Sequence, residues 1–280
     1  MVLNNSHRKN FALFYFSCFT ISFCWLFFNG WLLHELQPVF FLNRLDVTLN
    51  ILFLTGIQNA IIKSFAIQLS LDILYFFLPL SLVFVVNRKM QFYFAILNSI
   101  FNLTYALILS SVSPLSIAGF IGWILLPMLF VFTSDRGFYY AVNSMRYIFL
   151  LIFFSAGLWK IRTGGVFNTE QMSAILLKQH AAYLTQSPTD WFSRIVYYLV
   201  INYRFSYIVY VCAVIAELVF VIGFFTKKAD KLLILIFLLF ILFDFFLMRI
   251  NYFAWIAFLG CLWFAKYKEP GYAKAEALTV

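Results

Sequence analysis

Charged residues are scarce in this chain of 280 residues, at 11% of the total. A soluble domain carries about 25% charged residues, because much of its surface must face water. Hydrophobic residues instead make up 64% of the chain, and the mean hydropathy is +0.91. This shortage of polar surface excludes a soluble globule and predicts a protein whose exterior faces lipid.

The sequence also lacks the patterns of metal and nucleotide sites. It contains no HExxH, GxSxG, P-loop or GxGxxG pattern, and its three histidines stand far apart. The four cysteines lie inside apolar runs and form no CxxC pair: Cys18, Cys24, Cys212 and Cys261. We therefore predict no metal site and interpret the cysteines as small apolar side chains.

Long apolar runs recur along the whole chain and predict an all-α integral membrane protein with one transmembrane domain over 1–280. About 20 apolar residues cross the hydrocarbon core of a bilayer as a helix. We expect about eight spans, between seven and nine, because the last two runs are short and nearly continuous. The expected spans are 11–32, 64–86, 92–112, 115–133, 146–161, 205–225, 231–248 and 251–266.

The net charge is +9, but the sequence contains no basic tail or stripe that could follow a nucleic-acid backbone. No nucleic-acid partner is therefore expected. Cations concentrate instead in the short loops of one face, and such loops are cytoplasmic. This pattern predicts that both termini are cytoplasmic. The cations assigned to that side are Arg8, Lys9, Arg88, Lys89, Arg136, Arg146, Lys227, Lys228, Lys231, Lys266, Lys268 and Lys274.

Two segments of the outer face, 34–62 and 162–204, mix polar and apolar residues and are expected to lie along the membrane interface. The second predicts two amphipathic helices on the outer face. Asn168 with Gln171 resembles a capping box, which predicts a helix beginning there. The sequence from Ser187 to Asp190 predicts that the second helix begins there, with Ser187 as its N-cap.

Ionisable residues inside spans are candidate functional residues, because an unpaired charge in hydrocarbon is costly. Asp72, Glu217 and Asp244 lie within expected spans, and Lys160 lies at the outer end of one. The three acids are equally compatible with hydrogen bonding between helices. Arg249 is interpreted as an interfacial anchor or as the partner of Asp244.

The stretch 153–160 reads FFSAGLWK, with Gly164 and Gly165 shortly after it and AELVF at 216–220. This order resembles the horizontally transferred transmembrane family, whose members are vitamin K-dependent γ-carboxylase-like. The resemblance covers about residues 145–265 and extends more loosely to the N-terminal helices. It implies the same helical membrane fold.

The resemblance also implies a chemistry. In the carboxylase the lysine that ends this motif is a base in the oxidation of a lipid-soluble hydroquinone, which makes Lys160 the candidate base here. Asp72, Glu217 and Asp244 would tune it. Ala156, Gly157 and Trp159 would lie against a quinone-like lipid cofactor. Asn98 or Asn102 stands where the carboxylase relies on a histidine.

The small bacterial members that this chain resembles include a membrane protein that helps to mature a sporulation-delaying peptide toxin. That likeness implies a bacterial cytoplasmic membrane, a peptide substrate at the outer face and a membrane or periplasmic protein partner. Trp191, Phe192, Arg162 and Arg249 are the candidate residues for binding a substrate or partner.

Two other functions stay open at this point. The first is a non-catalytic membrane subunit that binds a partner through 34–62 and 162–204. The second is a transporter of protons or small solutes that uses the same acids, although the sequence shows no inverted repeat.

Overall fold

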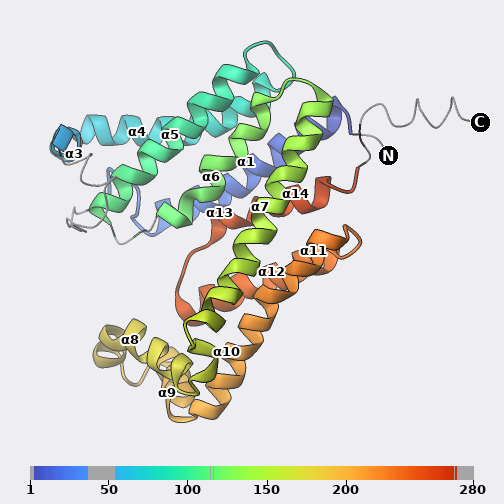
Figure 1. Ribbon diagram of the computed structural model, residues 1–280. Coiled ribbons are helices and arrows are strands. Elements are labelled where there is room, and N and C mark those ends of the chain that lie inside the picture. The colour runs from blue at the N-terminus through green and yellow to red at the C-terminus, as the bar shows by residue number, and fades with distance from the viewer. Residues whose placement is uncertain (1–2, 37–53, 114, 116, 268, 270–280) are drawn as a thin grey trace, which may run out of the picture. The chain divides into compact units, whose positions relative to one another are not determined.

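The computed structural model describes residues 3–36, 54–113, 115, 117–267 and 269, and no β-strand occurs among them (Figure 1). Within these described residues, six helical segments are long and apolar enough to cross a membrane. The protein is therefore a helical, multi-pass membrane protein, which confirms the predicted class. The six segments are α1 (Asn5–Phe28), α4 (Phe65–Val85), α5 (Gln91–Val112), α7 (Asp135–Arg162), Tyr203–Phe225 and Asp230–Met248.

Shorter elements connect and complete these six segments. Tyr203–Phe225 consists of α10 (Tyr203–Leu218), η4 (Val219–Val221) and α11 (Ile222–Phe225). Asp230–Met248 consists of α12 (Asp230–Phe243) and the π-turn η5 (Asp244–Met248). The remaining elements are α3 (Ile57–Lys63), η1 (Ile117–Phe120), α6 (Ile121–Leu125), η2 (Leu126–Val131), η3 (Gly165–Phe167), α8 (Gln171–Gln186), α9 (Trp191–Ile201), α13 (Phe253–Ile256) and α14 (Leu259–Phe264).

The predicted limits are accurate for some spans and wrong for others. α4 and α5 agree with the prediction to within one residue at each end. α1 begins six residues early, because the Asn4 side chain accepts hydrogen bonds from the backbone N–H groups of Ser6 and His7. α7 begins 11 residues before the expected position, at Asp135.

The expected fourth and eighth spans are short and interrupted helices. The stretch 117–131 changes from 3₁₀ to α and back to 3₁₀, with Pro127 in its last part. The stretch 253–264 contains two separate helices, α13 and α14. Both stretches are apolar and shorter than 18 residues, so they lie outside the set of six long segments.

The two amphipathic helices expected in 162–204 are present as α8 and α9, but both begin later than predicted. Asn168 precedes α8 by three residues and accepts a hydrogen bond from the Glu170 N–H. Asp190, not Ser187, is the N-cap of α9, because its carboxylate accepts from the Phe192 N–H at 3.1 Å. Of the segment 34–62, residues 37–53 lie outside the described part of the chain.

The chain forms two compact units. Unit 1 comprises Met1–Met145 and Tyr252–Val280, and unit 2 comprises Arg146–Asn251. α7 runs from one unit into the other. The prediction of a single transmembrane domain stays a prediction.

The core of unit 1 is aromatic and closely packed. Trp123 lies edge-on to Tyr15 and Phe19, at ring distances of 5.7 and 5.3 Å. Gly122 lies so close to α13 that an added Cβ would be 1.9 Å from the Ala254 carbonyl oxygen. Only glycine permits this contact between α6 and α13, which explains how two short helices complete the unit.

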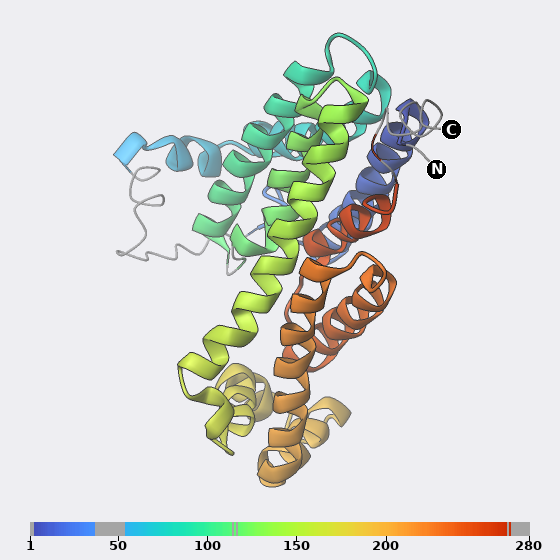
Figure 2. The same cartoon turned by 45° about the vertical axis from the view of Figure 1, so that its right-hand side comes forward.

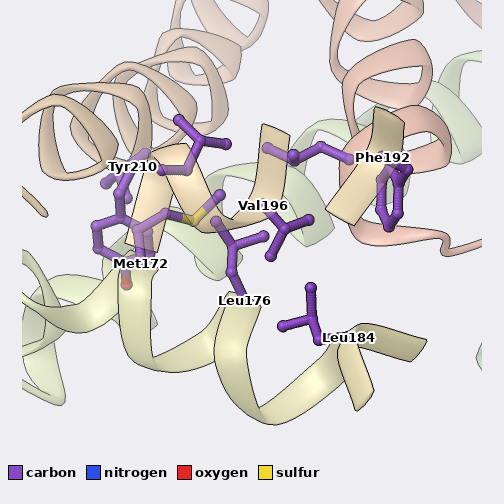
Figure 3. Close-up of a cluster of buried hydrophobic side chains, with 9 residues drawn as sticks. Met172, Leu176, Leu184, Phe192, Val196 and Tyr210 are labelled. Atoms are coloured by element: carbon purple, nitrogen blue, oxygen red, sulfur yellow. The ribbon is translucent and has the colours of Figure 1, made fainter. Parts of the chain in front are cut away.

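Unit 2 contains the second half of α7 together with α8 to α12, and α10 and α12 lie side by side (Figure 2). Phe149 and Phe153 of α7 pack against Phe220 and Phe237 with ring distances of 4.8–5.7 Å. α8 and α9 form a hairpin beside the first half of α10. Its apolar side chains meet α10 in one cluster (Figure 3), which includes Met172, Leu176, Leu184, Phe192, Val196 and Tyr210.

Two of the arginines assigned to the cytoplasmic side have side chains that are buried within the protein. Arg8 and Arg146 have side chains that are 2% and 0% exposed. Arg8 lies in the first turn of α1, which begins earlier than expected. Arg146 lies in the middle of α7 and forms two hydrogen bonds with Asp230, of 2.6 and 2.9 Å.

Candidate functional site

Lys160 and Glu217 form an ion pair inside unit 2. The Lys160 Nζ donates to Glu217 Oε1 at 2.7 Å. The lysine side chain is 31% exposed, whereas the glutamate side chain is only 4% exposed. One end of this pair is therefore open and the other is enclosed by protein.

α7 and α10 are displaced along their lengths relative to each other, and this offset brings Lys160 and Glu217 together. Lys160 lies two residues before the end of α7, whereas Glu217 lies 14 residues after the start of α10 at Tyr203. At 1.5 Å per residue, about 21 Å of α10 precedes Glu217. α10 thus extends beyond the end of α7, and the α8–α9 hairpin packs against this extension. The family resemblance implied that Glu217 lies near Lys160, and the direct ion pair depends on this offset.

Gly157 allows the two helices to approach closely at the ion pair. A Cβ at this position would lie 3.0 Å from Leu218 side-chain atoms and 3.2 Å from the Glu217 Cβ. Gly157, which the resemblance placed against a cofactor, therefore packs against α10. Ala156, the other small residue of the motif, is half-buried.

The Glu217 carboxylate is only partly satisfied. Its second oxygen, Oε2, is buried and has no hydrogen-bond partner among the described residues. Asp244, at the start of η5, interacts electrostatically with both Lys160 and Glu217. The three groups therefore form one electrostatic cluster, which carries a formal charge of −1 when all of them are ionised.

An apolar groove of about 360 Å³ runs between α10 and α12. Ala216 and Phe243 line it, and they directly precede Glu217 and Asp244 in the sequence. Cys212 and Ala213 line the α10 side of the groove, and their small side chains leave room for it. The groove would accept a hydrocarbon chain, and the two helices that form it also carry the acids of the cluster.

Asp72, the third acid that was predicted to lie within a span, lies in unit 1, and both of its carboxylate oxygens accept hydrogen bonds. Its carboxylate accepts from the Tyr105 hydroxyl at 2.6 Å and from the backbone N–H groups of Leu33 and His34 at 3.2 and 3.0 Å. The His34 Nδ1 is also 2.6 Å away. These contacts lie within unit 1, and the convergence of Asp72 with Lys160 stays a prediction.

The Arg249 guanidinium lies over the Phe192 ring, 4.2 Å from its centre. It forms this cation–π contact, and among the described residues it does not form the ion pair with Asp244 that one interpretation predicted. Phe192 is buried beneath it at 2% exposure. Trp191, its neighbour, is 63% exposed and remains available to a partner or to lipid.

Arg162 and Trp159 also contact each other, with the guanidinium 5.3 Å from the indole centre. Trp159 is 59% exposed, so its ring points out of unit 2. The structure therefore divides the FFSAGLWK motif into two faces. Gly157 and Lys160 contact α10, whereas Trp159 lies on the exposed side.

Asp190 and Tyr183 link the α8–α9 hairpin through a hydrogen bond of 2.7 Å. This bond holds the pKa of the Asp190 carboxyl below its ordinary value and raises the pKa of the Tyr183 hydroxyl. His180 of the same hairpin hydrogen-bonds to the Leu247 carbonyl oxygen at 2.9 Å, and burial lowers the pKa of this histidine. The His180 bond attaches the hairpin to the end of the segment Asp230–Met248.

No protein-family model matches this chain, and comparisons with curated proteins and with solved structures return no match. The function must therefore be argued from the site itself. Among the described residues, no three His, Cys, Asp or Glu side chains gather as metal ligands.

Sequence reasoning missed two polar partners. Asp230 fixes the buried Arg146, and His34 contacts Asp72. Asp230 lies 84 residues from Arg146, and no pattern in one sequence pairs residues so far apart. His34 lies in a segment interpreted as interfacial, so its approach to the span of Asp72 was not expected.

Proposed function

We propose that this protein is a membrane-embedded enzyme of the vitamin K-dependent γ-carboxylase-like type, which acts on a peptide at the outer face of a bacterial cytoplasmic membrane. The 2.7 Å contact between Lys160 and Glu217 carries this proposal. The family resemblance, which covers about residues 145–265, supports it. Unit 2, Arg146–Asn251, lies within that range.

The ion pair provides a route for a proton. A proton that passes from the Lys160 ammonium to the Glu217 carboxylate leaves two neutral groups, and a low-dielectric environment favours that state. The resulting amine can accept a proton from an acidic O–H group. The exposed third of the Lys160 side chain gives such a group access. Once Lys160 has accepted that proton, the Asp244 carboxylate would stabilise its positive charge.

A quinone-like lipid fits the groove between α10 and α12, because a hydrocarbon tail matches its apolar lining. Ala216, Phe240 and Phe243 would hold the tail, and the bound lipid would supply the oxidation chemistry. The Glu217 Oε2 has no donor within the described part of the chain, which supports a polar ligand group nearby.

In this proposal the protein has about eight spans, with the segments 117–131 and 253–264 as short spans beside the six long ones. The termini are cytoplasmic, and α8 and α9 are interfacial helices of the outer face. These assignments follow from the distribution of cations in the sequence.

Mass spectrometry of lipids extracted from the purified protein tests the cofactor. We expect a quinone-like lipid to copurify with the wild type and with Lys160→Ala. Ala216→Trp, which fills the groove, should remove it. Leu235→Trp, on the exposed face of α12 and outside the groove, is the control. A quinone retained by Ala216→Trp would contradict the assignment.

A non-catalytic subunit is the second candidate, and the exposed ring of Trp191 favours it. In that function, Trp191→Ala would release a partner protein, while Lys160→Ala would have no effect. Copurification of partners with both variants separates the two proposals. The transporter stays a hypothesis from the sequence.

A further inference from the structure

A second polar site lies in unit 1 and shares no residue with the Lys160 cluster. A cavity of about 430 Å³ opens where α1 begins, α4 ends and α5 begins. Three of its lining residues are cations. The lining residues that matter here are Arg8, Asn87, Arg88, Lys89, Gln91 and Thr133.

Arg8 forms a fixed, positively charged part of this cavity. Its guanidinium donates to the Thr133 carbonyl at 2.6 Å, the Gln91 side chain at 2.9 Å and the Phe132 carbonyl at 3.0 Å. Its acidic neighbour, Asp135, is 3.5 Å away, longer than the roughly 2.7–2.9 Å of a strong ion pair. Neutral acceptors therefore supply the three shortest hydrogen bonds of Arg8, and Asp135 is its one acidic partner among the described residues.

The turn between α4 and α5 places the other two cations. Asn87 adopts a left-handed conformation with φ 68°, which asparagine tolerates better than most residues. Its N–H donates to Gln91 Oε1 at 2.7 Å, and Gln91 in turn accepts from Arg8. Gln91 thus couples the turn to the buried arginine, and Arg88 and Lys89 remain exposed at the cavity.

The cavity lies at the ends of three helices that are each long enough to cross a bilayer. Helix ends of this kind leave the hydrocarbon core at the level of the lipid headgroups. Guanidinium and ammonium groups bind phosphate oxygens through charge-assisted hydrogen bonds. From the position and the charge together, we infer that this cavity binds the phosphate of an anionic phospholipid headgroup.

Native mass spectrometry of the full-length protein in detergent tests the inference, with dioleoyl phosphatidylglycerol as the probe. The double variant Arg88→Gln, Lys89→Gln should bind this lipid about 30-fold more weakly, since each cation near an anionic lipid surface contributes about fivefold. Both residues are exposed, so the variant should fold, and size-exclusion chromatography checks this. Lys228→Gln with Lys231→Gln, two exposed cations outside the cavity, is the matched control and should bind as the wild type does.

Dioleoyl phosphatidylcholine and inorganic phosphate complete the experiment. We expect weaker binding of the zwitterionic lipid and no displacement of phosphatidylglycerol by millimolar phosphate. Equal loss of binding in the control variant would overturn the inference, because it would show a diffuse charge effect. Full displacement by inorganic phosphate would also overturn it and indicate a site for free anions. Neither result depends on the function of Lys160.

Discussion

Asp72 and Glu217 are both acids buried inside candidate membrane helices, yet their surroundings differ. Asp72 receives hydrogen bonds on both carboxylate oxygens from Tyr105, Leu33 and His34. Glu217 has one partner, Lys160, and one oxygen without any among the described residues. A fully satisfied carboxylate stabilises a fold, whereas a half-satisfied one can still accept a proton or a ligand.

The buried pair of Arg146 and Asp230 extends the comparison. Arg146 forms two hydrogen bonds with Asp230 and also donates to the Gly223 carbonyl at 2.7 Å. Both carboxylate oxygens of Asp230 accept hydrogen bonds from Arg146, so neither is left without a partner. Each unit therefore has a fully bonded carboxylate, and unit 2 also has the open one at Glu217.

The largest effect on stability is expected for Arg146→Ala. Removal of one partner leaves Asp230 buried without its counter-charge, which costs about 3–5 kcal/mol of unfolding free energy. Equilibrium unfolding in mixed micelles measures this loss. Arg136→Ala is the control, because Arg136 pairs with Glu269 while 69% exposed, and such pairs contribute about 0–1 kcal/mol. Equal losses for the two variants would contradict the structural role of Arg146.

Asp72→Asn should have the next largest effect. The substitution places an NH₂ group where the wild-type carboxylate accepts from several donors, so at least one donor loses its acceptor. We expect a loss of about 1–3 kcal/mol in the same unfolding assay. The binding of a quinone-like lipid should stay unchanged, because Asp72 acts in the fold.

Glu217→Gln also replaces a carboxylate by an amide, but we expect it to change the unfolding free energy very little. The Gln side chain can still accept from Lys160, and a buried amide without a partner costs less than a buried carboxylate. Unfolding free energy should therefore change by less than about 1 kcal/mol. A loss as large as that of Asp72→Asn would show that Glu217 is a structural residue too.

The smallest effect concerns pH and the α8–α9 hairpin. Burial lowers the pKa of His180 from its ordinary value of 6.5, so folding favours the neutral ring. The stabilisation is present above pH 6.5 and is lost as the pH falls below it, because the unfolded chain then binds the proton more tightly. His180→Gln should flatten the decrease in melting temperature between pH 7.5 and about 5.5. An unchanged slope would exclude His180 as the cause.

The sequence predicted the class of the fold well, because it depends on the length and composition of apolar runs. The limits of α4 and α5 followed from the same signal. α1 begins at a cap supplied by Asn4, and α7 continues through Arg146, a charged residue that pairs with Asp230 inside the protein. Neither contact changes the average hydropathy of its segment, so neither could be predicted from it.

The candidate site was predicted only in part. Lys160, Glu217 and Asp244 were selected because ionisable groups are costly in hydrocarbon. Their contact depends on the offset between α7 and α10 and on Gly157, which are properties of the packed helices. The same argument also selected Asp72. The free-energy cost of an acid in hydrocarbon does not show whether both of its oxygens have hydrogen-bond partners.

The reactivity of Lys160 tests the central claim most directly. A lipophilic activated ester acylates only neutral amines, and peptide mass spectrometry measures the rate at each lysine. If Lys160 passes its proton to Glu217, it should react faster than Lys178, an exposed lysine of α8. Glu217→Gln should remove this advantage. Slower acylation of Lys160 than of Lys178 in the wild type would contradict the account and show a permanently charged structural pair.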